Sequence, residues 1–142
     1  SAPRGLNDEW DKMHQAHVKG DLVLVRRLVG KHPQLAKSRP LADTSWLNMA
    51  VRCDKTDLVR FWLRENSAGI RSSLLSARNA SMTQFLIGKR ANVNAWFGPW
   101  GTPLHRCVEP EQVRLLLAAG ADPAITDEEG RTPLVAMKSL RR

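Results

Sequence analysis

The chain has few cysteines and no long apolar run, and each shortage excludes a class of protein. Only two of its 142 residues are cysteines, which is too few for a disulfide framework. Cys53 and Cys107 lie in no CxxC or Cys/His cluster, so we expect two packed thiols in a reducing compartment. No stretch of eighteen apolar residues occurs, so no transmembrane helix is predicted.

Carboxylates are also scarce. The 14 Asp and Glu stand against 22 Lys and Arg, for a formal net charge of +8, and this surplus favours an anionic partner without choosing between protein, nucleic acid and lipid. Hydrophobic residues at 42% and charged residues at 25% are ordinary for a folded domain. The N-terminal Ser-Ala-Pro-Arg-Gly has no apolar segment and no initiator Met, so it does not predict a signal peptide. It leaves open that the chain is one domain of a longer protein.

A repeat of 30 residues organises the chain. The segment from Gly101 to Asp122 reads GTPLHRCVEPEQVRLLLAAGAD, and its opening returns at Gly130 as GRTPL. Thr102 is suited to cap a helix whose first turn accepts Pro103. The apolar residues of VRLLL are spaced as on one face of a second helix, and Gly120 supplies the left-handed residue after it.

These motifs resemble the ankyrin-repeat family: TPLH begins the first helix, VRLLL lies inside the second and GAD ends it. The resemblance implies an all-α solenoid of stacked helix-turn-helix pairs with short β-hairpin fingers. The expected units of this single domain, residues 1–142, are 8–36, 43–67, 70–93, 100–123 and a partial 130–142. The 30-residue step back from Gly120 places Arg90 at the position of the terminal glycine. In the pair further upstream, Asn66 replaces that glycine. Only five residues separate Asn66 from Ser72, too few for a finger, so we expect an irregular junction there.

The titratable groups form no catalytic set. No GxSxG, P-loop or HExxH motif occurs, so we expect neither an enzyme nor a cofactor. His14 and His105 occupy equivalent positions, and the resemblance implies that each braces the fingers through local hydrogen bonds. His14 and His17 are spaced to share a metal ion, but no third or fourth ligand is evident.

The positive charge is concentrated in the third unit. Residues 66–108 contain no Asp or Glu, which gives them a formal charge of +5. The cations of this interval are Arg71, Arg78, Lys89, Arg90 and Arg106. One interpretation is a solvated face that only keeps the protein soluble.

An aromatic finger lies beside this charge. Trp96, Phe97 and Trp100 surround Gly98 and Pro99, which allow a turn. At the equivalent positions the next finger reads DEEG, the family's DxxG pattern, so large rings replace residues that would brace a turn. Three aromatic rings at a solvent-facing tip are typical of a contact surface, although one or two could fold back and pack. The other tryptophans differ: we expect Trp62 in the core and Trp46 at the concave edge.

The resemblance implies a protein–protein interaction module. We expect the three finger aromatics to contact a partner protein and Arg71, Arg78 and Arg106 to pair with carboxylates of an acidic patch on it. We expect no nucleic-acid or membrane partner, a monomer when alone, and an intracellular location in the cytosol or nucleus.

Two alternatives belong to other classes. Basic residues with tryptophans for stacking also suit single-stranded nucleic acid. Ankyrin arrays also recruit substrates for larger enzymes, including secreted bacterial effectors that modify host proteins such as caspases. In that case the chain would act in the host cytosol as the targeting arm of an enzyme.

Overall fold

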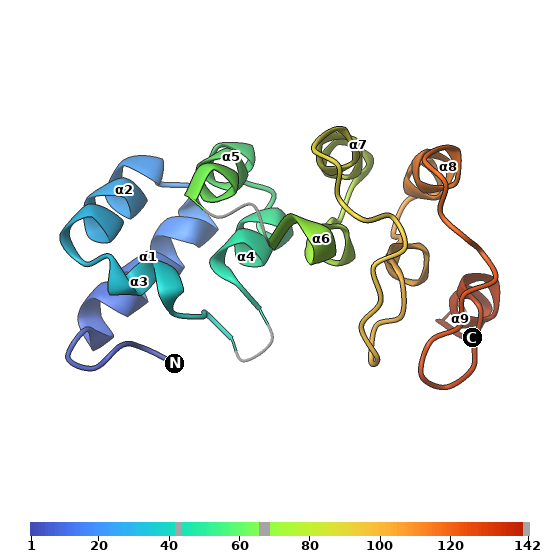
Figure 1. Cartoon of the computed structure of the whole chain (residues 1–142), viewed down its shortest axis with the longest axis horizontal. Coiled ribbons are helices and arrows are strands. Elements are labelled where there is room, and N and C mark those ends of the chain that lie inside the picture. Colours follow the sequence, from blue (N-terminus) through green and yellow to red (C-terminus); the bar gives the residue numbers. More distant parts are fainter. Residues whose placement is uncertain (42–43, 66–68, 141–142) are drawn as a thin grey trace. The chain divides into compact units, whose positions relative to one another are not determined.

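The structure is a computed structural model that describes residues 1–41, 44–65 and 69–140. The chain divides into two compact units, Ser1–Gly69 (unit 1) and Ile70–Arg142 (unit 2). Both are built from paired helices (Figure 1), so the all-α class expected from the ankyrin resemblance is confirmed. In the described ranges no helix combines the length and apolar character needed to cross a bilayer.

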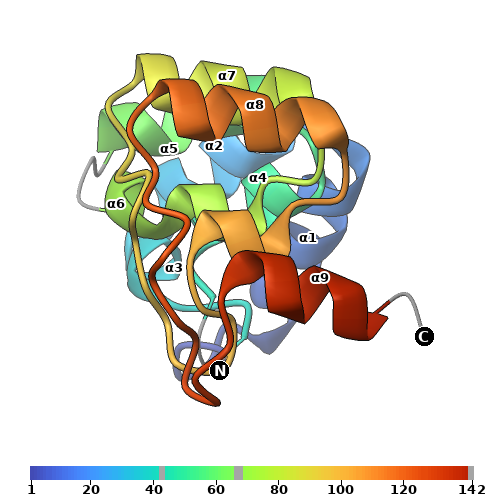
Figure 2. The same cartoon turned by 90° about the vertical axis from the view of Figure 1, so that its right-hand side faces the viewer.

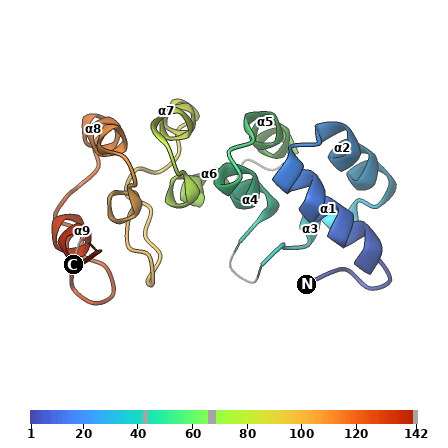
Figure 3. The same cartoon turned by 180° about the vertical axis from the view of Figure 1, so that it is seen from behind.

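Unit 1 consists of two helix pairs and a short extra helix. Its helices are α1 (Asn7–Lys19), α2 (Leu22–Lys31), α3 (Gln34–Lys37), α4 (Trp46–Arg52) and α5 (Thr56–Glu65). Helix α1 packs against α2, and α4 against α5 (Figure 3). The link inside each pair is tight because Gly20 and Asp54 adopt left-handed backbone angles, with φ of 79° and 59°. Asp21 and Ser45 cap α2 and α4 by accepting backbone N–H groups three residues later.

Helix α3 lies in the connection between α2 and α4. It stays folded because Leu35 is fully buried, so the connection contributes to the core. The Leu35 carbonyl also accepts a hydrogen bond from Trp46 Nε1 at 3.0 Å. Trp46 is only 2% exposed, so the expectation that it lies at the concave edge was wrong. The ring fills the space between α3 and α4 instead.

His17 is the buried polar centre of unit 1. Its ring lies between Trp46 and Trp62, with centroid distances of 4.7 and 5.8 Å. Trp62 Nε1 donates to His17 Nε2 at 2.8 Å, so Nε2 carries no proton. The proton is therefore on Nδ1, which donates to the Met13 carbonyl at 2.7 Å. Burial lowers the pKa of His17 from 6.5 to about 4, and the bond to Met13 offsets part of this effect.

Unit 2 also stacks helix pairs. Its elements are α6 (Ile70–Ser73), η2 (Leu74–Ser76), α7 (Ala80–Gly88), η3 (Pro103–Arg106), α8 (Pro110–Ala118) and α9 (Pro133–Leu140). Helices α7 and α8 lie side by side (Figure 2). Arg90 and Gly120 follow them with φ of 67° and 100°, the equivalence that the 30-residue step predicted. Asn66, expected to end the second unit, lies outside the described residues.

The connection before α8 is held by two side chains. Gln112 Oε1 accepts the backbone N–H groups of Val108 and Glu109. Gln112 Nε2 donates to the Ala77 carbonyl and to Thr83 Oγ1 at 3.2 and 3.0 Å. Glu109 caps the neighbouring helix α7 as well, because its carboxylate accepts the Ala80 N–H at 3.0 Å. Helices α7 and α8 therefore pack against each other although the first helix of this repeat is only the single 3₁₀ turn η3.

The buried His17 predicts a loss of stability in acid. The unfolded chain binds a proton near pH 6.5 and the folded chain only near pH 4. Stability is therefore full above pH 6.5 and falls as the pH drops from 6.5 to 4, by up to about 3 kcal/mol. Urea unfolding followed by tryptophan fluorescence at several pH values measures this slope.

His17→Gln is the comparison variant, because it removes the titrating group. We expect it to be less stable at pH 7 and to lose less stability than wild type between pH 6.5 and 4. Equal losses in the two proteins over this pH range would show that His17 does not cause the effect.

Candidate functional site

The aromatic finger is a tight turn closed by one antiparallel bridge. Phe97 and Gly101 exchange backbone hydrogen bonds of 3.0 and 2.7 Å, and the Trp100 N–H donates to the Phe97 carbonyl at 2.8 Å. Gly101 has a φ of 74°, and a Cβ at this position would lie 2.7 Å from the His105 ring. A glycine is therefore required at the base of the finger.

Trp96 is the exposed aromatic residue of the finger. Its side chain is 53% exposed, yet the indole is held in place because Nε1 donates to the Thr126 carbonyl at 2.9 Å. Thr126 belongs to the next finger, residues 122–131, which lies beside the first in unit 2 (Figures 1 and 2). One edge of the ring is thus fixed to the protein and the remainder faces solvent.

Phe97 and Trp100 form a half-buried pair. Their rings meet edge to face with centroids 5.2 Å apart, and the Arg106 guanidinium lies over Trp100 at 4.6 Å from the ring centroid. Arg106 Nε also donates to the Leu75 carbonyl at 3.3 Å. The structure therefore brings together three of the six predicted contact residues, with Arg106 in a cation–π geometry. Phe97 and Trp100, which were expected to face solvent at the tip, are therefore partly covered by contacts within unit 2.

The remaining predicted cations lie on other elements. Arg71 is exposed on α6, and Arg78 is exposed between η2 and α7. Neither takes part in the stacking that joins Phe97, Trp100 and Arg106. Lys89 follows the C-terminal end of α7, and its ammonium lies over the Phe85 ring, 5.6 Å from the ring centroid. The positive charge of unit 2 is therefore spread over several elements.

The second finger has the bracing that the first one lacks. Asp127 Oδ1 accepts the backbone N–H groups of Glu129 and Arg131 at 3.0 and 2.9 Å, and Oδ2 pairs with Arg131 Nε at 3.0 Å. The hydrogen bonds from the backbone and side chain of Arg131 hold the pKa of Asp127 below its usual value.

His105 connects the two fingers. Its Nδ1 accepts the Thr102 N–H at 3.0 Å, so the proton lies on Nε2, which donates to the Arg131 carbonyl at 2.9 Å. This is the bracing that the resemblance implied. The expected equivalence of His14 does not hold, because His14 packs against the rings of Trp10 and Trp46.

Two titratable side chains, His17 and Cys107, have surroundings that bear directly on their chemistry. Both nitrogens of His17 are engaged in hydrogen bonds, which removes it as a metal ligand alongside His14. Burial raises the pKa of the Cys107 thiol to about 11, so the thiol is protonated at neutral pH. Across the described part of the chain, no three His, Cys, Asp or Glu side chains gather as a metal site requires.

Glu128 is the residue beside the finger that sequence reasoning missed. A Cβ built on Gly98 would lie 2.4 Å from Glu128 Oε2 and 3.7 Å from the Trp96 ring. A carboxylate therefore flanks Trp96, whereas Arg106 accompanies Trp100. The 30-residue repeat could have indicated that Glu128 lies beside the finger. It aligns Gly98 with Glu128 and so predicts that the two loop tips are neighbours.

The chain is similar to a family model over one repeat and to a known protein over most of its length. Residues 101–128 match the family model of the ankyrin repeat. The chain is also 28% identical, over 94% of its length, to the E3 ubiquitin-protein ligase KEG of Arabidopsis thaliana, and it spans about 10% of that relative. The resemblance to ankyrin repeats is confirmed by the match, which contains Gly101 at the base of the first finger and Asp127 in the second.

The geometry of Gly101 predicts a sensitive position. Gly101→Ala places a Cβ against the His105 ring in a backbone conformation that disfavours side chains, so we expect a loss of about 2 kcal/mol or more in the free energy of unfolding. Urea unfolding measures it. Gly88→Ala is the matched control, since a Cβ there meets nothing within 4 Å. A Gly101→Ala protein as stable as the Gly88→Ala protein would contradict the assigned finger conformation.

Proposed function

We propose that the aromatic finger of unit 2 binds an acidic surface of a partner protein, with Trp96 as its exposed anchor. Ankyrin repeats are general protein–protein interaction modules, and the finger opens into the matched repeat, residues 101–128. The observation that carries the proposal is the state of Trp96, whose ring is 53% exposed although its N–H is bonded to Thr126. A large ring already fixed before binding loses little conformational entropy when a partner covers it.

The cations of the unit give the proposal its charge preference. Arg106 is exposed and its guanidinium lies over the Trp100 ring, and Arg71 and Arg78 are exposed as well. Arginine pairs with carboxylates in a planar, two-bond geometry. Because Glu128 flanks Trp96, the partner's acidic residues are expected on the Trp100 and Arg106 side of the finger, and an uncharged surface is expected over Trp96.

The similarity to an E3 ubiquitin-protein ligase favours a second candidate function. The chain spans only about 10% of that protein, so an ankyrin segment of this kind occurs there within a much larger chain. By this proposal the domain recruits a substrate for an enzyme to which it is joined. A longer native chain containing this domain would then modify the captured partner chemically, whereas an adaptor would leave the partner unchanged.

Trp96→Ala tests the anchor. The partner is first isolated by affinity capture on the immobilised wild-type chain, and its Kd is then measured by calorimetry. If Trp96 is an anchor, we expect a loss of roughly 2 kcal/mol, or about 30-fold in Kd. Val108→Ala is the control, because Val108 is a 72% exposed apolar residue of the same unit outside the finger.

Thermal unfolding of both variants separates binding from folding. A change below about 0.5 kcal/mol for Trp96→Ala, with the fold intact, would remove the finger from the contact surface. Random single-stranded oligonucleotides provide the further comparison. Tight binding to them that falls steeply with salt would favour nucleic acid over the proposed protein partner.

A further inference from the structure

A groove of about 520 Å³ lies between α2 and α5 of unit 1. In unit 2 the second helices of neighbouring pairs, α7 and α8, pack against each other, whereas in unit 1 the equivalent helices leave this space open. Its volume is in the range of about 300–1,000 Å³ that is typical of ligand sites. One wall consists of Arg26, Val29, Gly30 and Pro33, and the other includes Phe61 and Arg64.

Both walls of the groove offer surface to a ligand. Val29 and Phe61 are half-buried, and Gly30 and Pro33 are exposed. The Phe61 ring meets the Trp62 ring edge to face with centroids 5.0 Å apart, so it is held in position beside the groove. The lining residues of each helix are three or four positions apart and therefore share one face of it. The groove thus runs between two helix faces, a setting in which a further helix packs.

Gly30 is a glycine that the fold of α2 does not require. Its φ lies outside the left-handed region, and a Cβ built on it would meet nothing within 4 Å. The capping residue of α2 is His32, not Gly30. Glycine inside a helix destabilises it relative to alanine, so α2 is less stable than its surroundings allow. Because Gly30 lines the groove, the missing side chain leaves room there for a ligand.

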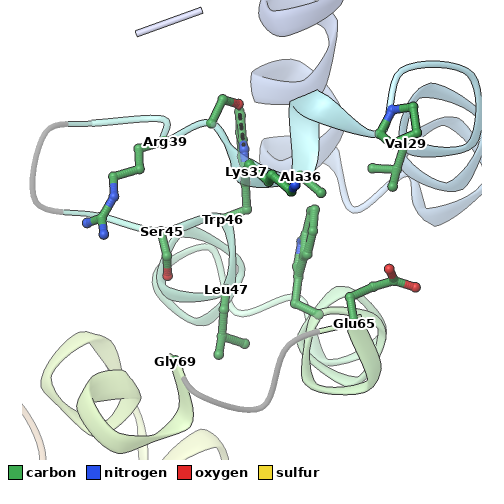
Figure 4. Close-up of a pocket in the computed structure, with 12 residues that line it drawn as sticks. Val29, Ala36, Lys37, Arg39, Ser45, Trp46, Leu47, Glu65 and Gly69 are labelled. Carbon is green, nitrogen blue, oxygen red and sulfur yellow. Dashed lines mark hydrogen bonds between the residues drawn. The ribbon is translucent and has the colours of Figure 1, made fainter. Parts of the chain in front are cut away.

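Positive charge prevails along the groove. Arg26 and Arg64 are exposed on its two sides, and the ion pairs found among the described residues include neither of them. Helix α2 also carries Arg27 and Lys31 and no acidic residue. Glu65, the last residue of α5 (Figure 4), lines the groove as well. Apolar surface between arginines fits a ligand whose apolar groups are flanked by carboxylates.

We propose that this groove is a second binding site, which takes an acidic amphipathic helix of a partner protein. Apolar side chains of that helix lie on Val29 and Phe61, its backbone passes close to Gly30, and its carboxylates pair with Arg26 and Arg64. Helices bind in grooves through an apolar face of residues three, four and seven positions apart. The site is independent of the finger, since its residues belong to unit 1.

The probe is the blocked peptide acetyl-Glu-Ala-Leu-Glu-Glu-Leu-Leu-Glu-Ala-Leu-Glu-Glu-amide, whose leucines share one helical face. We expect it to shift the amide NMR signals of Gly30 and Phe61, with a Kd tighter than about 1 mM by calorimetry. In two control peptides every leucine is replaced by serine, or every glutamate by glutamine. Each is expected to bind at least about tenfold more weakly than the probe.

Filling the groove locates the site. Gly30→Leu is expected to weaken peptide binding at least about tenfold, because the new side chain takes up space in the groove. It is expected not to lower the melting temperature, because leucine favours a helix over glycine. The matched control is Gly88→Leu, which makes the same change at a glycine of α7 where a Cβ also meets nothing within 4 Å. This control is expected to change the Kd less than about twofold.

Charge reversal tests the two arginines. Arg26→Glu combined with Arg64→Glu is expected to weaken the probe at least about tenfold. The matched control, Lys12→Glu with Lys19→Glu, makes the same change of charge on exposed positions of α1 and is expected to change the Kd less than about twofold. Thermal unfolding confirms that all of these proteins are folded.

Several results would overturn the proposal. One is the absence of any shift at Gly30 with the peptide at several millimolar. Another is an unchanged Kd in a folded Gly30→Leu protein, and a third is an equal loss of binding in the α1 control, which would indicate attraction to net charge alone. Trp96→Ala is expected to leave the peptide affinity unchanged. If it abolished the affinity, the peptide would be bound at the finger, and only the finger proposal would survive.

Discussion

The main-chain groups of the second finger depend on side chains from the repeat before it. Fingers this short form few backbone bonds of their own: Phe97 bridges Gly101 in the first, and the Asp127 N–H donates to the Arg131 carbonyl in the second. His105 therefore donates to the Arg131 carbonyl, and Trp96 donates to the Thr126 carbonyl. These bonds span 26 and 30 residues, close to one repeat, so the same bond that orders the second finger also fixes the exposed ring of the first.

The parts that could be predicted from sequence follow local rules. Asp21, Ser45 and Asn79 each cap a helix by accepting an N–H three residues later, which a single stretch of sequence specifies. The left-handed angle of Arg90 follows from its place one repeat before Gly120. The helix pairs and the finger turn are therefore visible in the chain before any contact between distant residues is known.

The parts that could not be predicted depend on distant residues. Trp62 and His17 bond across 45 positions, and no periodicity in either helix indicates this pairing. Helix α3 is four residues long, too short to produce a pattern, and forms because Leu35 has a buried site to fill. The six predicted contact residues do not form one cluster, for the same reason. Phe97, Trp100 and Arg106 contact one another, whereas Trp96 donates a hydrogen bond to the next finger.

Gln112 also limits how far the repeats of this protein are interchangeable. Its amide uses both ends, accepting from the Val108 and Glu109 N–H groups and donating to Ala77 and Thr83 of the preceding repeat. A standard repeat inserted before residue 100 would have to present an oxygen acceptor at each of those two positions, or leave a buried amide unsatisfied. Modular exchange, the property that makes this architecture attractive to protein engineers, is therefore restricted at this junction by a single side chain.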